Sequence, residues 1–472
     1  MASVVRLLAL ALAWTGVAAL VPALVSARWG EGLAPAFLAT TMGCAFLAGA
    51  MYFASAGLAG RIRRFQVFTA LSALWVLIPA VAAPVIAVAA RLELGPAWFE
   101  ALSAFTTTGF TQVPTGPRSL FVWFALLQWS GGLLTIVSAV AILAPAGIAG
   151  LPDRAVNRLD ERDAVDTAGV LKDVAPIYAG ALGLAFLAML FAGAEPYAAF
   201  CLASAATSAG AHLPPEARDV LEAGGAARWL FLPFLLWAAT SVRWHRALVT
   251  RRVHAAPEQP ESLILLGYWL VLGLLFSVLL FRLAPGVEVM GAIGEGLFTA
   301  ASLISTSGLP GASDTFRHLP EGLVLTVTLV GGGALSVAGG LKILRVRAML
   351  LRARGDLARL ISPNIVQPSR TGEGGIGSAM RGVWVGTVAL FATLAAVTVA
   401  FGFGAPSFEA ALTGAIAAMT NAGPIYDASG HDWPPVANLP VVSVAGAAFA
   451  MIAGRIETVG AFVLIHLAFW RT

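Results

Sequence analysis

The sequence predicts an all-α integral membrane protein: four pseudo-symmetric helix–pore loop–helix repeats around one pore, preceded by two extra transmembrane helices. Three observations predict this fold. The chain of 472 residues is 58% hydrophobic and only 11% charged, whereas a soluble globular chain carries about 25% charged residues. Its long apolar stretches match the thickness of a bilayer. Four short polar stretches that end in glycine recur between them, which is typical of a repeated structural unit.

The apolar stretches predict ten transmembrane helices and four shorter re-entrant segments. The helices are expected to start near residues 5, 34, 66, 120, 174, 227, 262, 321, 380 and 440. The shorter stretches are residues 97–108, 196–208, 293–306 and 407–420, and each is too short to cross a bilayer. Such segments are tolerated at membrane depth only where protein or a water-filled cavity surrounds their backbone.

The N-terminal 30 residues have some features of a cleaved signal peptide. Arg6 precedes an apolar run, and small residues at 25–27 precede Arg28. The apolar run is about 20 residues long, which exceeds the apolar region of a signal peptide and matches a membrane span. We therefore expect a retained first helix.

Basic residues cluster after every second predicted span. The groups are Arg61, Arg63 and Arg64; Arg154, Arg158, Arg162 and Lys172; Arg243, Arg246, Arg251 and Arg252; and Arg345, Arg347, Arg352, Arg354 and Arg359. All four groups fall on one side of the membrane, and the positive-inside rule makes that side cytoplasmic. We expect a multi-pass protein of the cell (inner) membrane with a cytoplasmic N-terminus and re-entrant segments that enter from outside.

The same counting divides the chain into five parts. Residues 1–60 are expected to hold the two extra helices, and residues 61–150, 151–255, 256–360 and 361–472 the first to fourth pore repeats.

The polar stretches align on four glycines that are roughly 100 to 115 residues apart. A hydroxyl side chain stands three positions before each glycine, and another small polar residue stands two before it. Phenylalanine stands ten positions before three of them, at Phe99, Phe200 and Phe298, whereas the fourth has Thr413. The predicted filter residues are Thr106, Thr107, Thr108 and Gly109; Thr207, Ser208, Ala209 and Gly210; Ser305, Thr306, Ser307 and Gly308; and Thr420, Asn421, Ala422 and Gly423.

This pattern favours a site for cations. A short helix that ends at mid-membrane points its partially negative C-terminus inward. The following glycine can adopt positive φ, which turns successive carbonyls toward a common axis. Rings of carbonyls replace the hydration shell of an ion in potassium filters. The hydroxyls can bond freed backbone groups or face the ion path. The filter residues are thus expected to bind K⁺, and no cofactor is expected.

At these residues the sequence resembles the TrkH/KtrB/HKT superfamily of potassium transporters, over essentially the whole chain. Further matching motifs are Gln128–Gly132, Gly331–Arg345, Asn421–Pro424 and Gly454–Glu457. The two helices before the first repeat are similar to the TrkH-like branch. Two residues depart from the family pattern: Ala211 follows the second-loop glycine, where an aromatic residue is common, and Leu309 follows the third.

The resemblance implies a potassium uptake pore subunit that conducts K⁺ and Rb⁺ inward and is gated by a cytoplasmic, TrkA-like ring of nucleotide-binding subunits. It implies one pore per chain, in a homodimer. In plant members serine at the first filter position accompanies sodium transport, so Gly109 favours potassium. The cytoplasmic loop carrying Arg345 to Arg359 and the linker 153–173 are where such a ring could dock.

Two further features suggest a gate. Residues 329–342 interrupt an apolar span with five glycines. Each glycine costs roughly 1 kcal/mol in a helix, so irregular backbone is expected there, and plain small-residue helix packing is the alternative. By resemblance this segment is a movable gate, and Arg455, which lies deep in an apolar run, is a barrier beneath the filter, although a snorkelling or structural arginine is the alternative. The gate residues are Gly331, Gly332, Gly333, Ser336, Gly339, Gly340, Lys342 and Arg455.

Other functions lack support in the sequence. Cys44, Cys201 and six scattered histidines form no metal-binding spacing, and no nucleophile or acid–base pair indicates an enzyme. The GxGxxG match at 372–377 precedes a membrane span rather than following a strand, so it does not predict a dinucleotide site. The charge of +4 gives no reason to expect nucleic acid. A Na⁺- or H⁺-coupled secondary transporter and a non-conducting sensor remain alternatives, the former usually built from inverted repeats.

Overall fold

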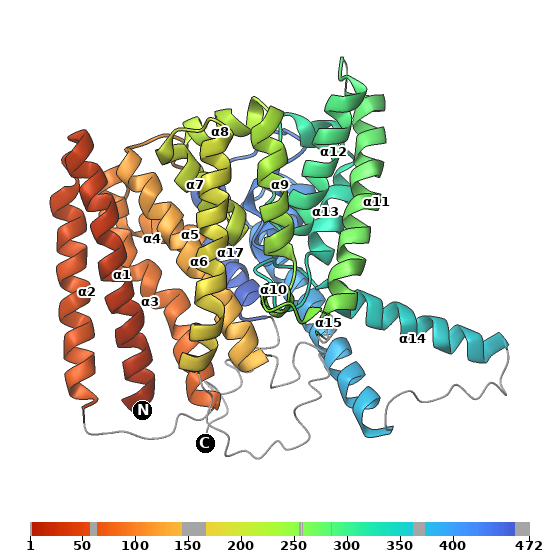
Figure 1. The fold of residues 1–472 in the computed structure, drawn as a ribbon, viewed down its shortest axis with the longest axis horizontal. Helices are drawn as coiled ribbons and strands as arrows, with labels where there is room; N and C mark the ends of the chain where they lie inside the picture. Colours follow the sequence, from red (N-terminus) through yellow and green to blue (C-terminus); the bar gives the residue numbers. More distant parts are fainter. Residues whose placement is uncertain are drawn as a thin grey trace.

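The computed structural model describes residues 2–56, 64–143, 167–253, 256, 258–284, 286–361 and 373–457 (Figure 1). In these ranges all regular structure is helical and no strand occurs. The predicted all-α membrane fold is therefore confirmed. Several residues named in the sequence analysis lie outside the described ranges: Arg61, Arg63, Arg154, Arg158, Arg162 and Gly372. The predicted part boundaries at 60/61 and 150/151 also lie there.

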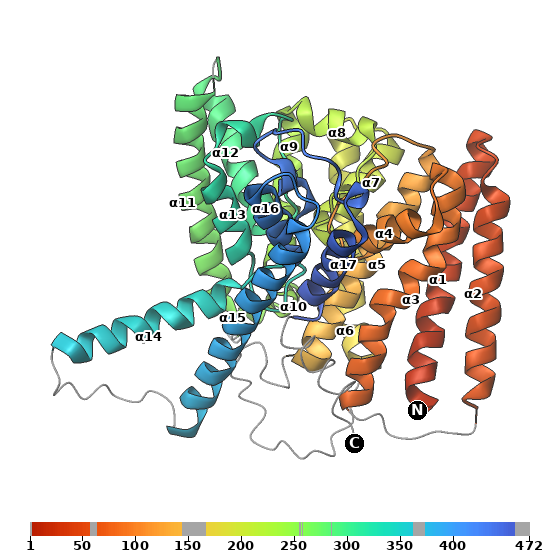
Figure 2. The same cartoon turned by 180° about the vertical axis from the view of Figure 1, so that it is seen from behind.

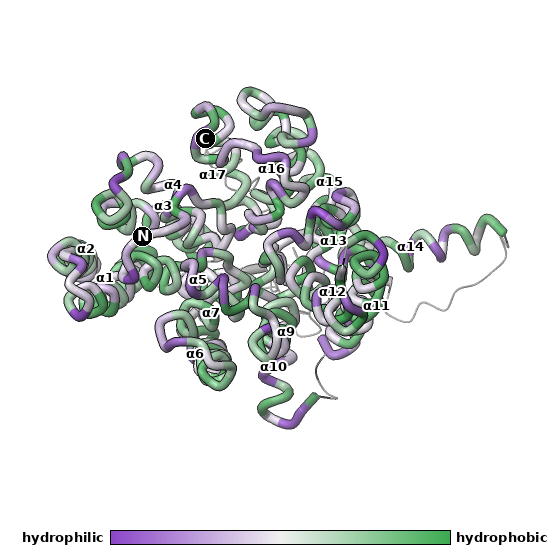
Figure 3. The backbone as a smooth tube through the Cα atoms, turned by 90° about the horizontal axis from the view of Figure 1, so that it is seen from above, coloured by the Kyte–Doolittle hydropathy of each residue, from purple (hydrophilic) through white to green (hydrophobic). Residues whose placement is uncertain are grey.

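The first two helices form a hairpin at one edge of the molecule. Helix α1 spans Ala2–Trp29 and helix α2 spans Ala34–Ala54, and both stand outside the repeats in Figure 3. They pack closely at Gly16, where the Thr41 hydroxyl donates a hydrogen bond of 3.0 Å to the glycine carbonyl. A methyl group at Gly16 would lie 2.8 Å from the Cβ of Cys44. A small residue is thus required at this crossing.

Each of the four repeats consists of a long helix, a short buried helix and a second outer helix. The first repeat is α3 (Arg64–Ala90), α4 (Leu94–Phe105) and α5 (Arg118–Ser138); the second is α6 (Thr167–Phe191), α7 (Pro196–Ser208) and α9 (Gly225–Ala239); the third is α11 (Gln259–Leu283), α12 (Val289–Ile304) and α13 (Glu321–Val330); and the fourth is α15 (Glu373–Gly402), α16 (Phe408–Thr420) and α17 (Val441–Arg455). Figure 3 shows these repeats around a common centre.

Shorter elements connect the repeats. They are the helices α8 (Pro215–Glu222), α10 (Val242–Val249) and α14 (Ile343–Ile361), the π-helix Ala139–Leu143, and the 3₁₀ helices Thr315–His318, Gly423–Asp427 and Val436–Asn438. Helices α8 and α9 are bent by 104° relative to each other. In Figures 1 and 2, α8 lies at the end of the bundle opposite to the N-terminus.

Seven described helices are long and apolar enough to cross a membrane, or eight if the bent pair counts as one span. The ten predicted spans include two that form only short helices in the described residues, α13 and α17. Helix α13 stops because the glycine-rich segment begins at Gly331, whose φ is +67°. Leucine, valine and phenylalanine side chains on the outer helices are exposed, as expected of a lipid-facing surface; they include Phe46, Leu187 and Val271.

The segment after the third repeat differs from its predicted form. The predicted loop containing Arg345 to Arg359 instead forms helix α14, which projects sideways from the bundle (Figure 2). Its arginines alternate with exposed leucines such as Leu350 and Leu357, and Arg352 pairs with Asp356 one turn away at 3.0 Å. Loops and amphipathic helices have similar charge content, so the arginines alone could not distinguish a helix from the predicted loop. The helical spacing of the leucines is the signal that indicates a helix.

Candidate functional site: an ion pathway at the centre of the repeats

The four predicted filter loops meet at the centre of the molecule. The amide of Gly423 donates to the carbonyl of Thr108 at 2.6 Å. The Asn421 side chain donates to the Thr108 hydroxyl at 3.0 Å, which joins the fourth loop to the first. The Ser307 hydroxyl donates to the Gly210 carbonyl at 3.3 Å, which joins the third loop to the second. All sixteen predicted filter residues are buried except Gly109, which is half-buried.

Each short helix ends in a residue with left-handed backbone. These residues are Thr107, Ala209, Thr306 and Asn421, with φ between +53° and +59°. Positive φ is uncommon for residues other than glycine and clusters at functional sites. Gly109 and Gly308 follow with φ of +89° and +66°. The chain therefore turns sharply at the end of every short helix, and the partially negative helix C-termini converge on the centre.

The second loop differs from the others in register. Its left-handed residue lies one position before the glycine, at Ala209, whereas in the other loops it lies two positions before. A methyl group at Gly210 would overlap the side-chain oxygen of Gln128. That Gln128 amide accepts from the His212 amide at 3.0 Å and donates to the His212 carbonyl at 3.1 Å. Gly210 is thus required by packing behind the loop, which sequence alignment alone did not reveal.

The hydroxyls three positions before the glycines bond the last turn of their own helices. Thr106 donates to the Leu102 carbonyl at 2.7 Å, Thr207 to Ala203 at 2.8 Å, Ser305 to Ser302 at 3.0 Å and Thr420 to Ile416 at 2.7 Å. The two roles expected for these hydroxyls are to bond freed backbone groups or to face the ion path. Their hydrogen atoms serve the first role, because they are donated to carbonyls freed at the helix ends. The hydroxyl oxygens keep lone pairs for other partners.

The glycine-rich segment between α13 and α14 lies directly beneath these loops. The amide of Gly339 donates to the Thr306 hydroxyl at 2.7 Å, and a methyl group at Gly339 would overlap the Thr420 carbonyl. The Ser336 hydroxyl bonds the Gly333 carbonyl at 2.6 Å, and the Lys342 ammonium bonds the Ala338 carbonyl. The predicted gate residues therefore touch the predicted filter from the side opposite to α8.

Two neighbouring helices hold the other end of this segment. The amides of Gly333 and Val337 donate to the carbonyls of Ala239 and Ala238 at the end of α9, at 2.8 and 3.1 Å. The amide of Ala334 donates to the carboxylate of Glu261 at 2.7 Å. Glu261 is buried near the start of α11. The sequence analysis missed Glu261, although an acidic residue at the start of an apolar helix is a detectable signal.

Arg455 joins the filter to the glycine-rich segment. Its guanidinium donates to the Thr106 carbonyl at 2.7 Å, to the Val337 carbonyl at 2.5 Å and to the Thr107 hydroxyl. The side chain is 2% exposed, so the snorkelling alternative is wrong. Glu457, two residues further on, pairs instead with Arg345 at the start of α14.

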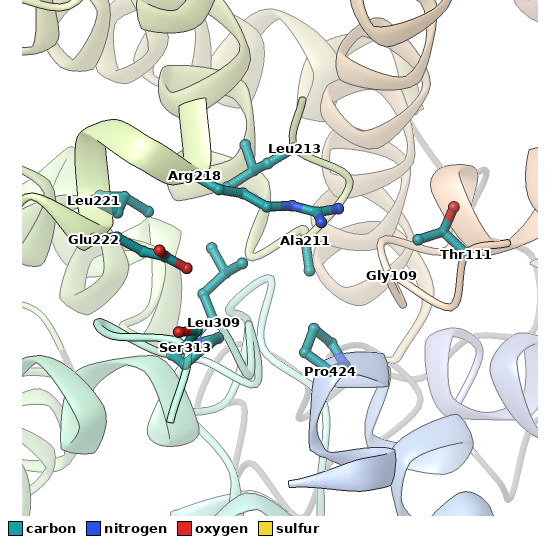
Figure 4. Close-up of a pocket in the computed structure, with 11 residues that line it drawn as sticks. Gly109, Thr111, Ala211, Leu213, Arg218, Leu221, Glu222, Leu309, Ser313 and Pro424 are labelled. Atoms are coloured by element: carbon teal, nitrogen blue, oxygen red, sulfur yellow. The ribbon is translucent and has the colours of Figure 1, made fainter. Parts of the chain in front are cut away.

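A cavity lies on the other side of the filter loops (Figure 4). Its volume is about 330 Å³. It is lined by the filter residue Gly109 and by the residues that directly follow the other three filter glycines, which are Ala211, Leu309 and Pro424. Helix α8 contributes one wall. The cavity therefore gives the four loops an opening toward the α8 end, with a largely apolar lining that also includes Arg218 and Glu222.

Among the described residues, one group of side chains could hold a metal ion. Ligand atoms of Glu321, Glu409 and His431 lie within 4.8 Å of one another. A hydrogen bond with Glu321 raises the pKa of the Glu409 carboxyl. Both acids stand in the first turn of a helix, where they complement the helix dipole. Thr413 and Ser429 each donate to Glu321 at 2.9 Å. These contacts account for the cluster without an ion.

Comparisons with known proteins agree with this fold. No family model matches the chain. The potassium uptake protein TrkI of Halomonas elongata is 28% identical over 425 residues, which cover 87% of this chain and 85% of TrkI. TrkH of the same organism is 27% identical over 499 residues, 99% of each chain. The crystal structure of the potassium transporter TrkH from Vibrio parahaemolyticus matches with a TM-score of 0.83, covering 100% and 99% of the two chains at 23% identity.

The fold and the central site define a multi-pass membrane protein with four pore-loop repeats. Its relatives match it over nearly their full length, and its fold is that of TrkH. In sequence the chain is similar to the Trk potassium uptake proteins, and in fold it resembles the TrkH/KtrB superfamily. Its relatives are uptake proteins and not enzymes, and neither is this chain.

Proposed function

We propose that the chain is the pore subunit of a potassium uptake system and conducts K⁺ and Rb⁺ into the cell. The observation that carries this proposal is the meeting of four glycine loops beneath a cavity, joined by the bonds from Gly423 and Asn421 to Thr108 and from Ser307 to Gly210. Converging helix C-termini and turned carbonyls provide the negative potential that a dehydrated cation needs. The relatives' names as potassium uptake proteins support the choice of ion.

The segment Gly331–Lys342 and Arg455 would form the gate of this pore. A cation that leaves the filter meets a guanidinium held between the Thr106 and Val337 carbonyls. Glycine-rich irregular backbone can change conformation at low cost because it has few side chains to repack. Movement of this segment would displace both its own backbone and the partners of Arg455.

The gate would be controlled from the cytoplasm. In this proposal the pore subunit lies in the inner membrane with its N-terminus inside, forms a homodimer, and binds a TrkA-like nucleotide-binding ring. Helix α14 begins directly after the gate segment, and Arg345 at its start pairs with Glu457. A regulatory ring that moves α14 would therefore also move the Gly331–Lys342 segment.

Ion flux into liposomes that hold the purified chain tests the proposal. Gradients of K⁺, Rb⁺ and Na⁺ are compared without a co-ion, and again with Na⁺ or H⁺ supplied. Flux with K⁺ and Rb⁺ well above Na⁺ is expected. Flux only with a co-ion would favour the coupled transporter instead. If the isolated chain is closed, K⁺-dependent thermal stabilisation still reports on ion binding, and no stabilisation by K⁺ over Na⁺ would contradict the proposal.

A further inference from the structure

An arginine lies in the cavity above the filter loops. Arg218 stands on α8, and its guanidinium extends toward Ala211 and Gly109 in Figure 4. It lines the same cavity of about 330 Å³ as these two residues. A cation in this cavity therefore comes close to the arginine as it approaches Gly109.

The guanidinium of Arg218 forms no ion pair among the described residues. Glu222, one turn further along α8, lines the same cavity, but its carboxylate points toward Ser313. Arg228 provides the contrast, because it pairs with Glu295 and donates to the Leu221 and Gly311 carbonyls at 3.0 and 2.9 Å.

A guanidinium is charged at every physiological pH. A fixed positive charge in a narrow cavity with low-dielectric walls lowers the local concentration of cations, just as a negative charge raises it. Arginines form barriers to cations of this kind in other selective pores. A structural role is poorly supported, since the side chain makes no hydrogen bond among the described residues.

We propose that Arg218 is an outer barrier that sets the rate at which monovalent cations enter the filter. Glu222 offsets part of its charge from the cavity wall. The inference rests on the proposed function, because it concerns entry into the same filter. It adds a second positively charged control point, on the opposite side of the filter from Arg455.

Substitutions at Arg218 test the barrier through Rb⁺ flux into liposomes at low and high ionic strength. Arg218→Gln is expected to raise the initial rate roughly tenfold at low ionic strength. The gain should shrink in 1 M salt, where charges are screened beyond about 3 Å. Arg218→Lys keeps the charge and should behave like the wild type, and Glu222→Gln should lower the rate. Arg317→Gln is the matched control, because it removes an exposed arginine that does not line the cavity.

A second readout does not need an open gate. The Rb⁺ concentration that gives half of the maximal thermal stabilisation should fall in Arg218→Gln and rise in Glu222→Gln. If the wild type shows flux or stabilisation and Arg218→Gln gives the same values, the barrier is overturned but the proposed function stays intact. An equal gain from Arg317→Gln would also overturn it, since general surface charge would then suffice. No response of the wild type to K⁺ or Rb⁺ in either assay would instead contradict the proposed function itself.

Discussion

Arg455 combines a charge and a set of hydrogen bonds, and two substitutions separate them. Arg455→Gln removes the charge beneath the filter and is expected to raise K⁺ flux several-fold, because a barrier to cations is lost. Arg455→Lys keeps the charge but cannot reach the acceptors on Thr106, Thr107 and Val337 together. It should leave flux low and reduce the free energy of unfolding by about 2 kcal/mol. Flux and thermal unfolding measure the two effects. Equal flux in Arg455→Gln and the wild type would refute the barrier.

Gly109 is constrained by backbone and by space. Its φ is +89°, and an added Cβ would lie 2.6 Å from the Cβ of Ala211. Gly109→Ser is therefore expected to lower the K⁺/Na⁺ permeability ratio and to cost about 1–3 kcal/mol of stability through strain.

Ala211→Gly provides the control for that substitution. The double variant gives the serine room and should recover part of the stability, while the permeability ratio stays low. Bi-ionic reversal potentials and melting temperatures distinguish the two effects. If folded Gly109→Ser keeps the wild-type K⁺/Na⁺ permeability ratio, Gly109 is not part of the filter.

At the scale of elements, the gate segment depends on a close contact between Gly339 and the end of α16. Gly339→Ala would overlap the Thr420 carbonyl, so the segment must move away from the filter. We expect higher K⁺ flux and a lower melting temperature. Gly322→Ala on α13 is the control, because an added methyl there meets no atom within 4 Å. Lower flux in a folded Gly339→Ala variant would show that the segment does not obstruct the pore.

The short helices were predictable from the sequence because each has its own apolar pattern and a marked end. The second segment was predicted at residues 196–208 and forms α7 at Pro196–Ser208. The turn after α7 was not predictable. Its register depends on Gln128, a residue 82 positions before Gly210 in the chain, whose side chain packs where a Cβ would lie.

Contacts between distant elements were likewise hidden. The bond from Gly339 to Thr306 joins residues 33 positions apart, and that from Arg345 to Glu457 joins residues 112 positions apart. The apolar run around Arg455 marked this residue as unusual but did not identify the Thr106, Thr107 and Val337 partners that it binds. The fold followed from local patterns, whereas the connection between filter and gate required the assembled repeats.

At the scale of the whole molecule, orientation in the membrane decides which compartment each end of the ion pathway faces. Part of the charge pattern that predicts it belongs to residues 57–63 and 144–166, outside the described ranges. Among the described residues, Arg317 lies between α12 and α13, whereas Arg352 lies on α14 at the opposite end (Figure 1). If the arginine-rich end is cytoplasmic, these two positions face opposite compartments.

Cysteine labelling tests this orientation. The two native cysteines, Cys44 and Cys201, are buried, so they should react slowly with a membrane-impermeant maleimide. Arg317→Cys is expected to label on intact cells, and Arg352→Cys only after the membrane is permeabilised. The reverse pattern would invert the protein, place Arg218 on the cytoplasmic side and make the Gly331–Lys342 segment face outward. The direction of uptake, the docking side of a regulatory ring and the meaning of both arginine barriers therefore depend on this one result.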